Sequence, residues 1–230
     1  MKQVIDRNRI NKNALLSNIA SIGGLLILMA SVILPVFVKG TSIISGIMMV
    51  VGLGVAMVGI YFANRWVRKP RPEDRLDKVL KGLSEKYVLF HYPHLPSDHI
   101  LLTPASVIVI ETINIGGDYF FKNGKWKENM TIGRAIRYIV EEHLGDPCRA
   151  AKESANAIHT KLNQIEGLSG SIPVKPVVVF THPATQLESL NPPIPVMKVE
   201  KLRKHVDAGT TKLPQEDYDK VFEFLEANTR

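Results

Sequence analysis

The chain has 230 residues, one cysteine and a formal net charge of +7, which is distributed very unevenly. Residues 1–71 carry nine basic side chains and one acidic side chain, so the rest of the chain is nearly neutral. The positive charge therefore lies beside apolar segments and gives no support to a nucleic-acid interface. A single cysteine excludes an internal disulfide framework and a cysteine-rich zinc site.

Two uncharged segments, 13–38 and 40–64, follow a short basic stretch at the N-terminus. Each exceeds the ~20 apolar residues that a helix needs to cross the ~30 Å hydrocarbon core of a bilayer. Because only a few residues around Lys39 separate them, the sequence predicts an antiparallel transmembrane hairpin over 13–66, with Pro35 near its turn. Basic residues at both outer ends predict an integral, multi-pass protein of the cell membrane with both termini in the cytoplasm.

The alternative for the first segment is a cleaved signal peptide. Its apolar stretch is longer than the usual ~7 to 15 residues, no small-x-small cleavage site follows, and a second span comes next. The absence of charge inside both spans indicates an anchor rather than a transport pathway. Small residues recur at intervals of four, at Ala20 and Gly24, Gly52 and Ala56, and Gly59 and Ala63. This spacing favours a close helix–helix contact, although glycine and alanine are also simply common in membrane helices.

Prolines and cations follow the second span. Residues 67–72 are expected to form a basic linker that ends the helix, and the cations within 65–71 suit anionic lipid head groups. The predicted organisation is a cytoplasmic N-terminal segment (1–12), the hairpin (13–66), the linker (67–72) and one soluble domain (73–230). The lipid bilayer is the partner that this organisation predicts.

The soluble domain has alternating helix and strand patterns. We expect an amphipathic helix at 73–86 and three strands at 87–92, 99–103 and 107–112. A fourth strand at 118–122 ends in an Asn-Gly turn before Trp126. The remaining predicted elements are helices at 132–144 and from Asp146-Pro147 to Gly167, strands at 176–180 and 195–199, and helices at 200–206 and 214–228. This order predicts an α/β domain with helices around a mixed sheet.

Two acidic residues stand at the ends of neighbouring predicted strands. Asp98 precedes one strand and Glu111 lies near the end of the next, so antiparallel pairing would bring both carboxylates to one end of the sheet. Glu73, in the first turn of the preceding helix, could approach the same end. Oxygen ligands of this kind suit Mg²⁺, although acids at strand ends are also commonly solvated.

These segments resemble a known family, the nuclease-related domain NERD of the PD-(D/E)XK nuclease superfamily. The resemblance covers about 73–206 and is carried by Glu73, by Leu-Pro-Ser-Asp-His-Ile-Leu-Leu-Thr-Pro at 95–104 and by Val-Ile-Val-Ile-Glu-Thr at 107–112. Asp146-Pro147 takes the place of the family's Asn-Pro pair. The resemblance implies a restriction-endonuclease-like mixed sheet in which Asp98 and Glu111 would bind Mg²⁺.

The family's motif also implies a lysine two residues after the glutamate, where this chain has Ile113. We therefore expect a membrane-anchored cytoplasmic domain that is catalytically impaired and acts in binding or assembly. The alternative is a Mg²⁺-dependent nuclease of DNA or RNA that uses Glu73, Asp98 and Glu111 with a relocated lysine, either Lys122 or Lys152.

Four further residues could carry chemistry: three histidines and the single cysteine. His91, His94 and His99 have a loosely metal-like spacing, but the prolines among them favour loop histidines over a zinc site. Cys148 is expected to be structural. The chain has no phosphate-binding glycine loop and no nucleophile elbow, so the sequence does not support nucleotide hydrolysis or serine esterase chemistry.

Overall fold

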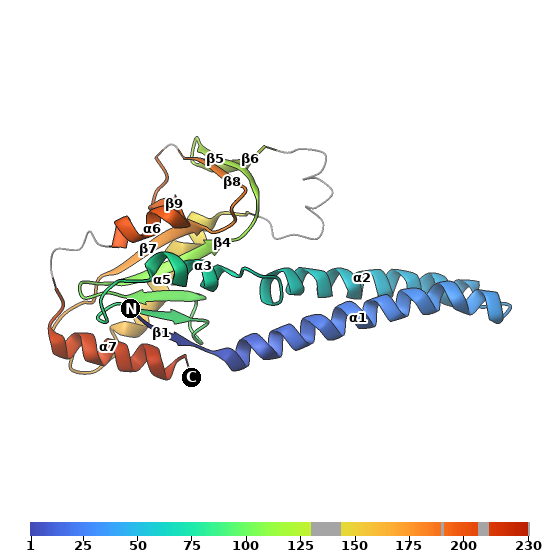
Figure 1. The fold of residues 1–230 in the computed structure, drawn as a ribbon, viewed down its shortest axis with the longest axis horizontal. Helices are drawn as coiled ribbons and strands as arrows, with labels where there is room; N and C mark the ends of the chain where they lie inside the picture. The colour runs from blue at the N-terminus through green and yellow to red at the C-terminus, as the bar shows by residue number, and fades with distance from the viewer. Residues whose placement is uncertain (130–143, 190, 207–211, 230) are drawn as a thin grey trace. The chain divides into compact units, whose positions relative to one another are not determined.

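The computed structural model describes residues 1–129, 144–189, 191–206 and 212–229. The chain divides into two compact units. One is Arg7–Arg71, and the other combines Met1–Asp6 with the described residues from Pro72 onward. Figure 1 shows both units and labels most of their elements.

The first unit is a pair of long helices, α1 (Arg7–Phe37) and α2 (Ser42–Trp66), joined by a short turn. Both helices are long and apolar enough to cross a membrane. Their outer surfaces are made of large apolar side chains, and Val36 and Phe37 near the turn are 77% and 80% exposed. Such a surface is unusual for a helix pair in water and normal for one in lipid.

Small residues bring α1 and α2 together along one seam. The buried positions recur every seven residues, as listed here: Ser17, Gly24 and Ser31 in α1, and Ser45, Gly52 and Gly59 in α2. A Cβ atom added to Gly24 would lie 2.7 Å from Ala56 Cα, so the two backbones are in direct contact. The close contact predicted from the spacing of small residues is therefore present at Gly24, Ala56 and Gly59.

The second unit is built on a mixed six-stranded sheet in the order β1-β2-β3-β4-β7-β9. Its strands are β1 (Lys2–Ile5), β2 (Val88–His91), β3 (His99–Leu102), β4 (Val107–Ile113), β7 (Val174–Phe180) and β9 (Val196–Lys198). Pairing is antiparallel from β2 to β4 and parallel for β1 with β2, β4 with β7 and β7 with β9.

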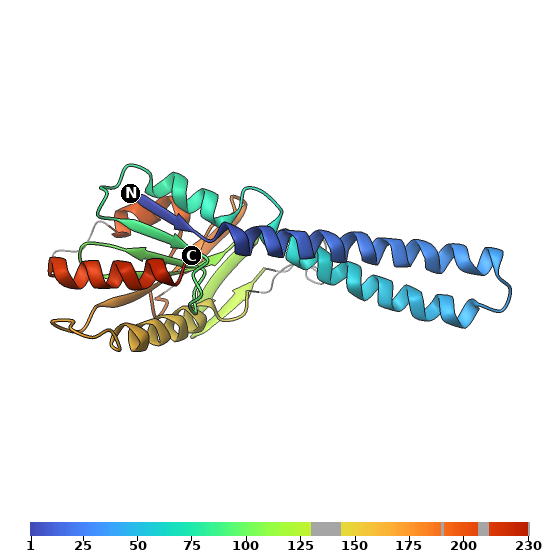
Figure 2. The ribbon, with the colours of Figure 1, turned by 90° about the horizontal axis from the view of Figure 1, so that it is seen from below.

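Helices cover both faces of this sheet (Figure 2). On one face, α3 (Pro72–Leu80) and α6 (Val199–Val206) bury leucines and valines against Leu89, Leu101 and Ile110. On the other face, α5 (Pro147–Leu162) and α7 (Gln215–Ala227) pack against a second set of strand residues that includes Phe90 and Val109. The predicted α/β architecture, a mixed sheet flanked by helices after two long apolar helices, is confirmed.

A smaller three-stranded sheet, in the order β6-β5-β8, completes the unit. It consists of β5 (Gly117–Lys122), β6 (Lys125–Glu128) and β8 (Thr185–Ser189). Asn123 and Gly124 both have positive φ, as a two-residue hairpin turn requires. Tyr119 and Trp126 of the hairpin contact Phe180, with ring centroids 5.6 and 5.9 Å away, and Phe121 contacts Trp126.

Several boundaries differ from the sequence expectations. Strand β1 was not predicted, because four residues leading directly into a helix give too short an alternating pattern. Strand β8 was also missed. Helix α3 ends at Leu80 rather than residue 86, since Gly82 adopts a φ of 89° in a turn, and α5 ends at Leu162 with Asn163 as its C-cap. The helix expected at 132–144 lies almost entirely outside the described residues.

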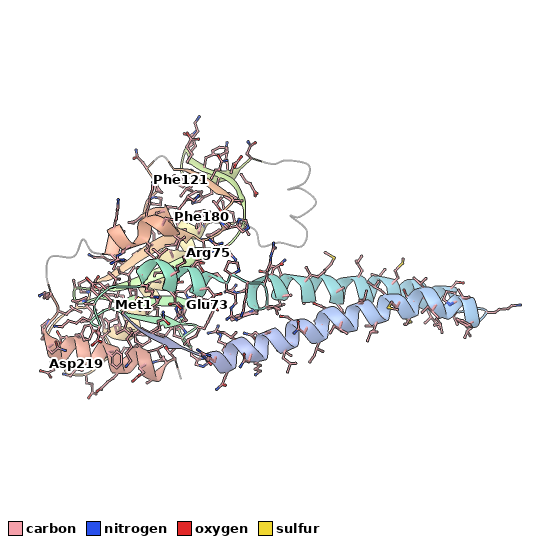
Figure 3. All side chains as sticks on the ribbon, viewed as in Figure 1. Met1, Glu73, Arg75, Phe121, Phe180 and Asp219 are labelled. Atoms are coloured by element: carbon pink, nitrogen blue, oxygen red, sulfur yellow. The ribbon has the colours of Figure 1, made fainter. Side chains whose placement is uncertain are left out.

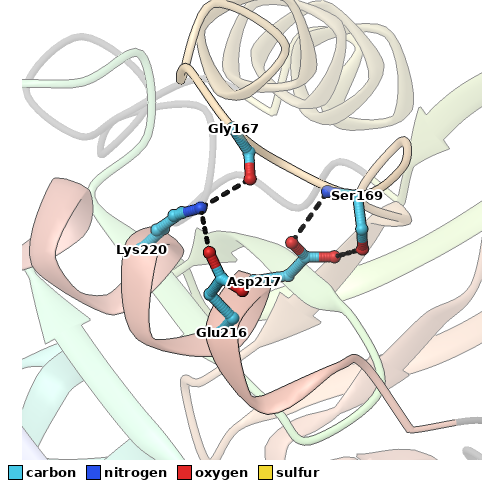
Figure 4. Close-up of polar contacts among 5 residues, drawn as sticks. All are labelled: Gly167, Ser169, Glu216, Asp217 and Lys220. Atoms are coloured by element: carbon cyan, nitrogen blue, oxygen red, sulfur yellow. Dashed lines mark hydrogen bonds and ion pairs between the residues drawn. The ribbon is translucent and has the colours of Figure 1, made fainter.

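A polar clamp holds the segment after α5 against α7 (Figure 4). Asp217 is 3% exposed and accepts hydrogen bonds from the backbone N–H of Ser169, at 2.9 Å, and from the Ser169 hydroxyl. These hydrogen bonds lower the pKa of Asp217 below its ordinary value. Lys220 donates to the Gly167 carbonyl at 2.5 Å and pairs with Glu216 at 2.6 Å.

Candidate functional site

The candidate site lies at the end of the large sheet where β2 and β4 finish and β3 begins. The β3–β4 ladder pairs His99 with Ile110, so the next step of the antiparallel register places Asp98 opposite Glu111. On the other side of β3, the backbone N–H of Tyr92 donates to the Asp98 carbonyl at 2.6 Å. The structure thus brings Asp98 and Glu111, both half-buried, to one end of the sheet.

Glu73 is linked to this end through Tyr92. It stands in the first turn of α3 (Figure 3), is 2% exposed, and its Oε2 accepts a hydrogen bond from the Tyr92 hydroxyl at 2.7 Å. Tyr92 has a φ of 58°, a left-handed conformation that non-glycine residues adopt mainly at special positions. This conformation lets one residue contact Asp98 through its backbone and Glu73 through its side chain.

The three acids do not share one face of the sheet. In β4, Glu111 alternates with Ile110, whose side chain packs under α3 and α6, so Glu111 projects toward the α5 and α7 side. Glu73 belongs to α3, which covers the opposite face. The structure therefore brings Asp98 and Glu111 together by strand register, while Glu73 reaches the same end from the other face.

Two buried histidines form a hydrogen-bonded chain beside Glu73. His91 is 0% exposed and His99 is 1% exposed, and their Nδ1 atoms are 2.9 Å apart. Asp77 Oδ1 lies 3.1 Å from His91 Nε2. When both rings are neutral, His91 donates from Nε2 to Asp77, so its Nδ1 accepts and His99 donates from Nδ1. This chain ties α3 to the ends of β2 and β3.

The expectation of loop histidines was wrong for His91 and His99. Both belong to strands, and they lie two residues from the core residues Leu89 and Leu101, on the same face under α3. That period-two pattern was the signal that would have placed them in the interior. Only His94 is exposed, and its Nε2 lies 3.4 Å from Oδ2 of the buried Asp6, which follows β1.

Neither candidate replacement lysine contacts the acids. Lys122 ends β5, is exposed and pairs across the hairpin with Lys125. Lys152 is exposed on α5, one residue after the buried Ala151. Among the residues that the structure describes, neither ammonium group makes a hydrogen bond or ion pair with Asp98 or Glu111.

Ile113 continues the face of β4 that carries Glu111, two residues earlier. It is half-buried and packs against the apolar cluster formed by Ile115, Tyr119 and Phe180 with the N-terminal turn of α5. The same cluster contains Cys148, whose thiol pKa is raised by burial. Ile113, an apolar residue, thus stands at the position where the family resemblance implies a lysine.

The acids supply oxygen ligands of the type that Mg²⁺ prefers, and this ion usually keeps several waters. Asp98 and Glu111 are the pair that would hold it. In the described part of the chain, no group of three or more histidine, cysteine or acidic side chains gathers closely enough to hold an ion. A site here would therefore depend on two carboxylates and on water.

Comparison with known proteins agrees with the resemblance noted in the sequence. No curated protein and no solved structure gave a significant match to the chain. Residues 71–181, which include α3, the β2–β4 strands and β7, match the family model NERD, described as the nuclease-related domain.

Proposed function

We propose that this protein is a membrane-attached nuclease-related domain that binds its ligand without cutting it. Ile113 carries this proposal, because this half-buried apolar side chain stands two residues after Glu111, where the resemblance leads us to expect a lysine. The acids Asp98 and Glu111 are retained as a polar, weakly cation-binding pair. Such a site keeps the groups that approach a phosphate through an ion and lacks the group that activates water.

The apolar residue at position 113 favours binding over cleavage on energetic grounds. A positioned proton-transfer or charge-stabilising group typically contributes a factor of ~10² to 10⁴ in rate. Lys122 and Lys152 are exposed, and within the described residues they form no hydrogen bond or ion pair with the carboxylates, so neither replaces that contribution in this arrangement. Binding or assembly is then the role that the remaining groups serve.

Membrane attachment rests on the two apolar helices and on where the chain joins them. Strand β1 precedes α1, and it pairs with β2, which follows α2. Strands of one sheet occupy one compartment, so two spanning helices between them must cross out and back. With basic residues at both outer ends, this supports an integral, two-span protein with both ends of the hairpin in the cytoplasm.

The short connections also hold the candidate site within reach of the membrane. Asp6 alone separates β1 from α1, and residues 67–72 join α2 to Glu73. Six residues extend at most about 20 Å. The cations of this connection suit anionic lipid head groups, so we expect the connection itself to lie at the lipid surface.

The second candidate is a Mg²⁺-dependent nuclease of DNA or RNA. It is favoured by the placement of Asp98 opposite Glu111 at one sheet end, with Glu73 nearby. A ligand-induced movement of Lys122 or Lys152 would be required to complete it.

A cleavage assay separates the two candidates. Full-length protein in detergent is incubated with plasmid and single-stranded substrates and Mg²⁺ or Mn²⁺, beside Asp98→Ala and Glu111→Ala. We expect the wild type to match the rate of both variants. We also expect Ile113→Lys to gain metal-dependent cleavage that Asp98→Ala abolishes, with Ile113→Gln as the uncharged control. Wild-type cleavage that both alanine variants lose would establish the nuclease instead.

A further inference from the structure

The outer face of the β5–β6 hairpin carries a group of exposed lysines that take no part in the packing of the fold. The ladder pairs Lys122 with Lys125 and Phe120 with Lys127, and paired residues project to the same face. Lys122, Lys125 and Lys127 are therefore on one face, and all three are exposed. We call these three residues the hairpin lysines.

The opposite face of the hairpin does the packing. Tyr119 and Phe121 are buried, and Trp126 lies 5.3 Å from Phe121 and 5.9 Å from Phe180 between ring centroids. The hairpin is thus held by its aromatic face, and the lysines of the outer face are free to serve another purpose.

The lysine arrangement is unfavourable for the isolated fold. Lys122 and Lys125 are directly opposite each other beside the turn, and like charges in such a cross-strand pair repel. In the described part of the chain, none of the hairpin lysines forms an ion pair with an acid. Asp118 and Glu188 share this face: Glu188 lies in the row of Phe120 and Lys127, with Phe120 between it and the lysine, and Asp118 lies one row further from the turn. An anionic partner would remove the repulsion.

We propose that the hairpin lysines dock on an anionic lipid surface. This inference rests on the membrane attachment proposed above, because the short connections keep the domain at a high effective concentration near the bilayer. A lysine near an anionic leaflet strengthens association by about fivefold, and the factors multiply for three lysines in one plane. Lipid phosphates are the partner that the tether supplies, and the charges are complementary.

Direct lipid contact at this face can be measured with a fluorescent label. Asn129→Cys places a bimane on the same face as Lys125 and Lys127 without changing the charge. The native Cys148 is buried and its thiol pKa is raised, so it competes poorly for the label. Full-length protein is reconstituted in nanodiscs of phosphatidylcholine, or of phosphatidylcholine with about one third phosphatidylglycerol, each containing head-group spin-labelled lipid.

We expect at least fivefold stronger quenching in the anionic discs than in the neutral discs. Replacing the hairpin lysines together (Lys122→Gln, Lys125→Gln, Lys127→Gln) should reduce quenching to the neutral-disc level. The matched control removes three exposed lysines elsewhere in the same unit (Lys86→Gln, Lys161→Gln, Lys201→Gln) and should leave quenching unchanged. High salt should act like the hairpin variant.

Three results would overturn the proposal: equal quenching in both lipids, equal loss in the control variant, or label protection by single-stranded DNA on neutral discs without any effect of anionic lipid. The last would assign the face to nucleic acid. Co-elution of the protein with the discs is checked in every sample. If the protein fails to co-elute, the membrane attachment itself is refuted, which distinguishes that failure from a failure of the lysine surface.

Discussion

The seam between α1 and α2 leads to a sharp prediction, because two neighbouring glycines differ completely in their surroundings. A Cβ atom at Gly24 would lie 2.7 Å from Ala56 Cα and 2.8 Å from Ala56 Cβ, whereas one at Gly23 would meet nothing within 4 Å. Carbon atoms that are not bonded prefer separations of about 3.5 to 4.0 Å. Gly24→Ala must therefore push the two helix backbones apart by about 1 Å.

Overpacking of this kind costs about 1 to 3 kcal/mol. Gly23→Ala should be neutral or stabilising by up to about 1 kcal/mol, since alanine is the better helix former. The assay follows energy transfer between labels at Asn11→Cys and Asn64→Cys, near the outer ends of the two helices, while SDS is titrated into detergent micelles. A midpoint that falls for Gly24→Ala alone is expected. Equal effects of the two substitutions on the unfolding midpoint would refute the close contact between the helices at Gly24.

Three other predictions concern the soluble unit. Tyr92→Phe removes the hydroxyl that donates to Glu73 and should lower the free energy of unfolding by about 1 to 3 kcal/mol in denaturant titrations. Ser169→Ala should weaken acid sensitivity: the lowered pKa of Asp217 stabilises the fold above the ordinary aspartate pKa, and this contribution disappears as pH falls through the lowered value. Unfolding measured against pH should show a smaller loss below the ordinary aspartate range in Ser169→Ala than in wild type. Cys148 should react with a thiol reagent much faster after denaturation than before it, because burial raises its pKa and shields it. Equal rates in the two states would contradict that placement.

The parts of the fold that sequence predicted are those with long, regular patterns. The two uncharged segments predicted the helix pair, and the apolar runs at 87–92, 99–103 and 107–112 predicted the three central strands. Because these strands are consecutive and antiparallel, the ends carrying Asp98 and Glu111 had to coincide, which is why this part of the site was predictable.

The other features of the fold and the site depend on backbone conformations and strand pairings that no local sequence pattern predicts. Strand β1 is four residues long and exists because β2 offers it an edge. The role of Tyr92 depends on a left-handed backbone at a tyrosine, which sequence favours only for glycine or asparagine. Likewise, the contact of His91 with His99 follows from strand register across the β2–β3 pair.

The most direct test concerns the claim that one α/β unit is interrupted by a membrane hairpin after its first strand. Single cysteines at Gln3 in β1 and at Lys161 in α5, both exposed, are probed with a membrane-impermeant maleimide. We expect both to be protected in intact cells and both to react in inverted membrane vesicles. Labelling of one cysteine from outside and the other from inside would contradict the shared sheet and the hairpin together.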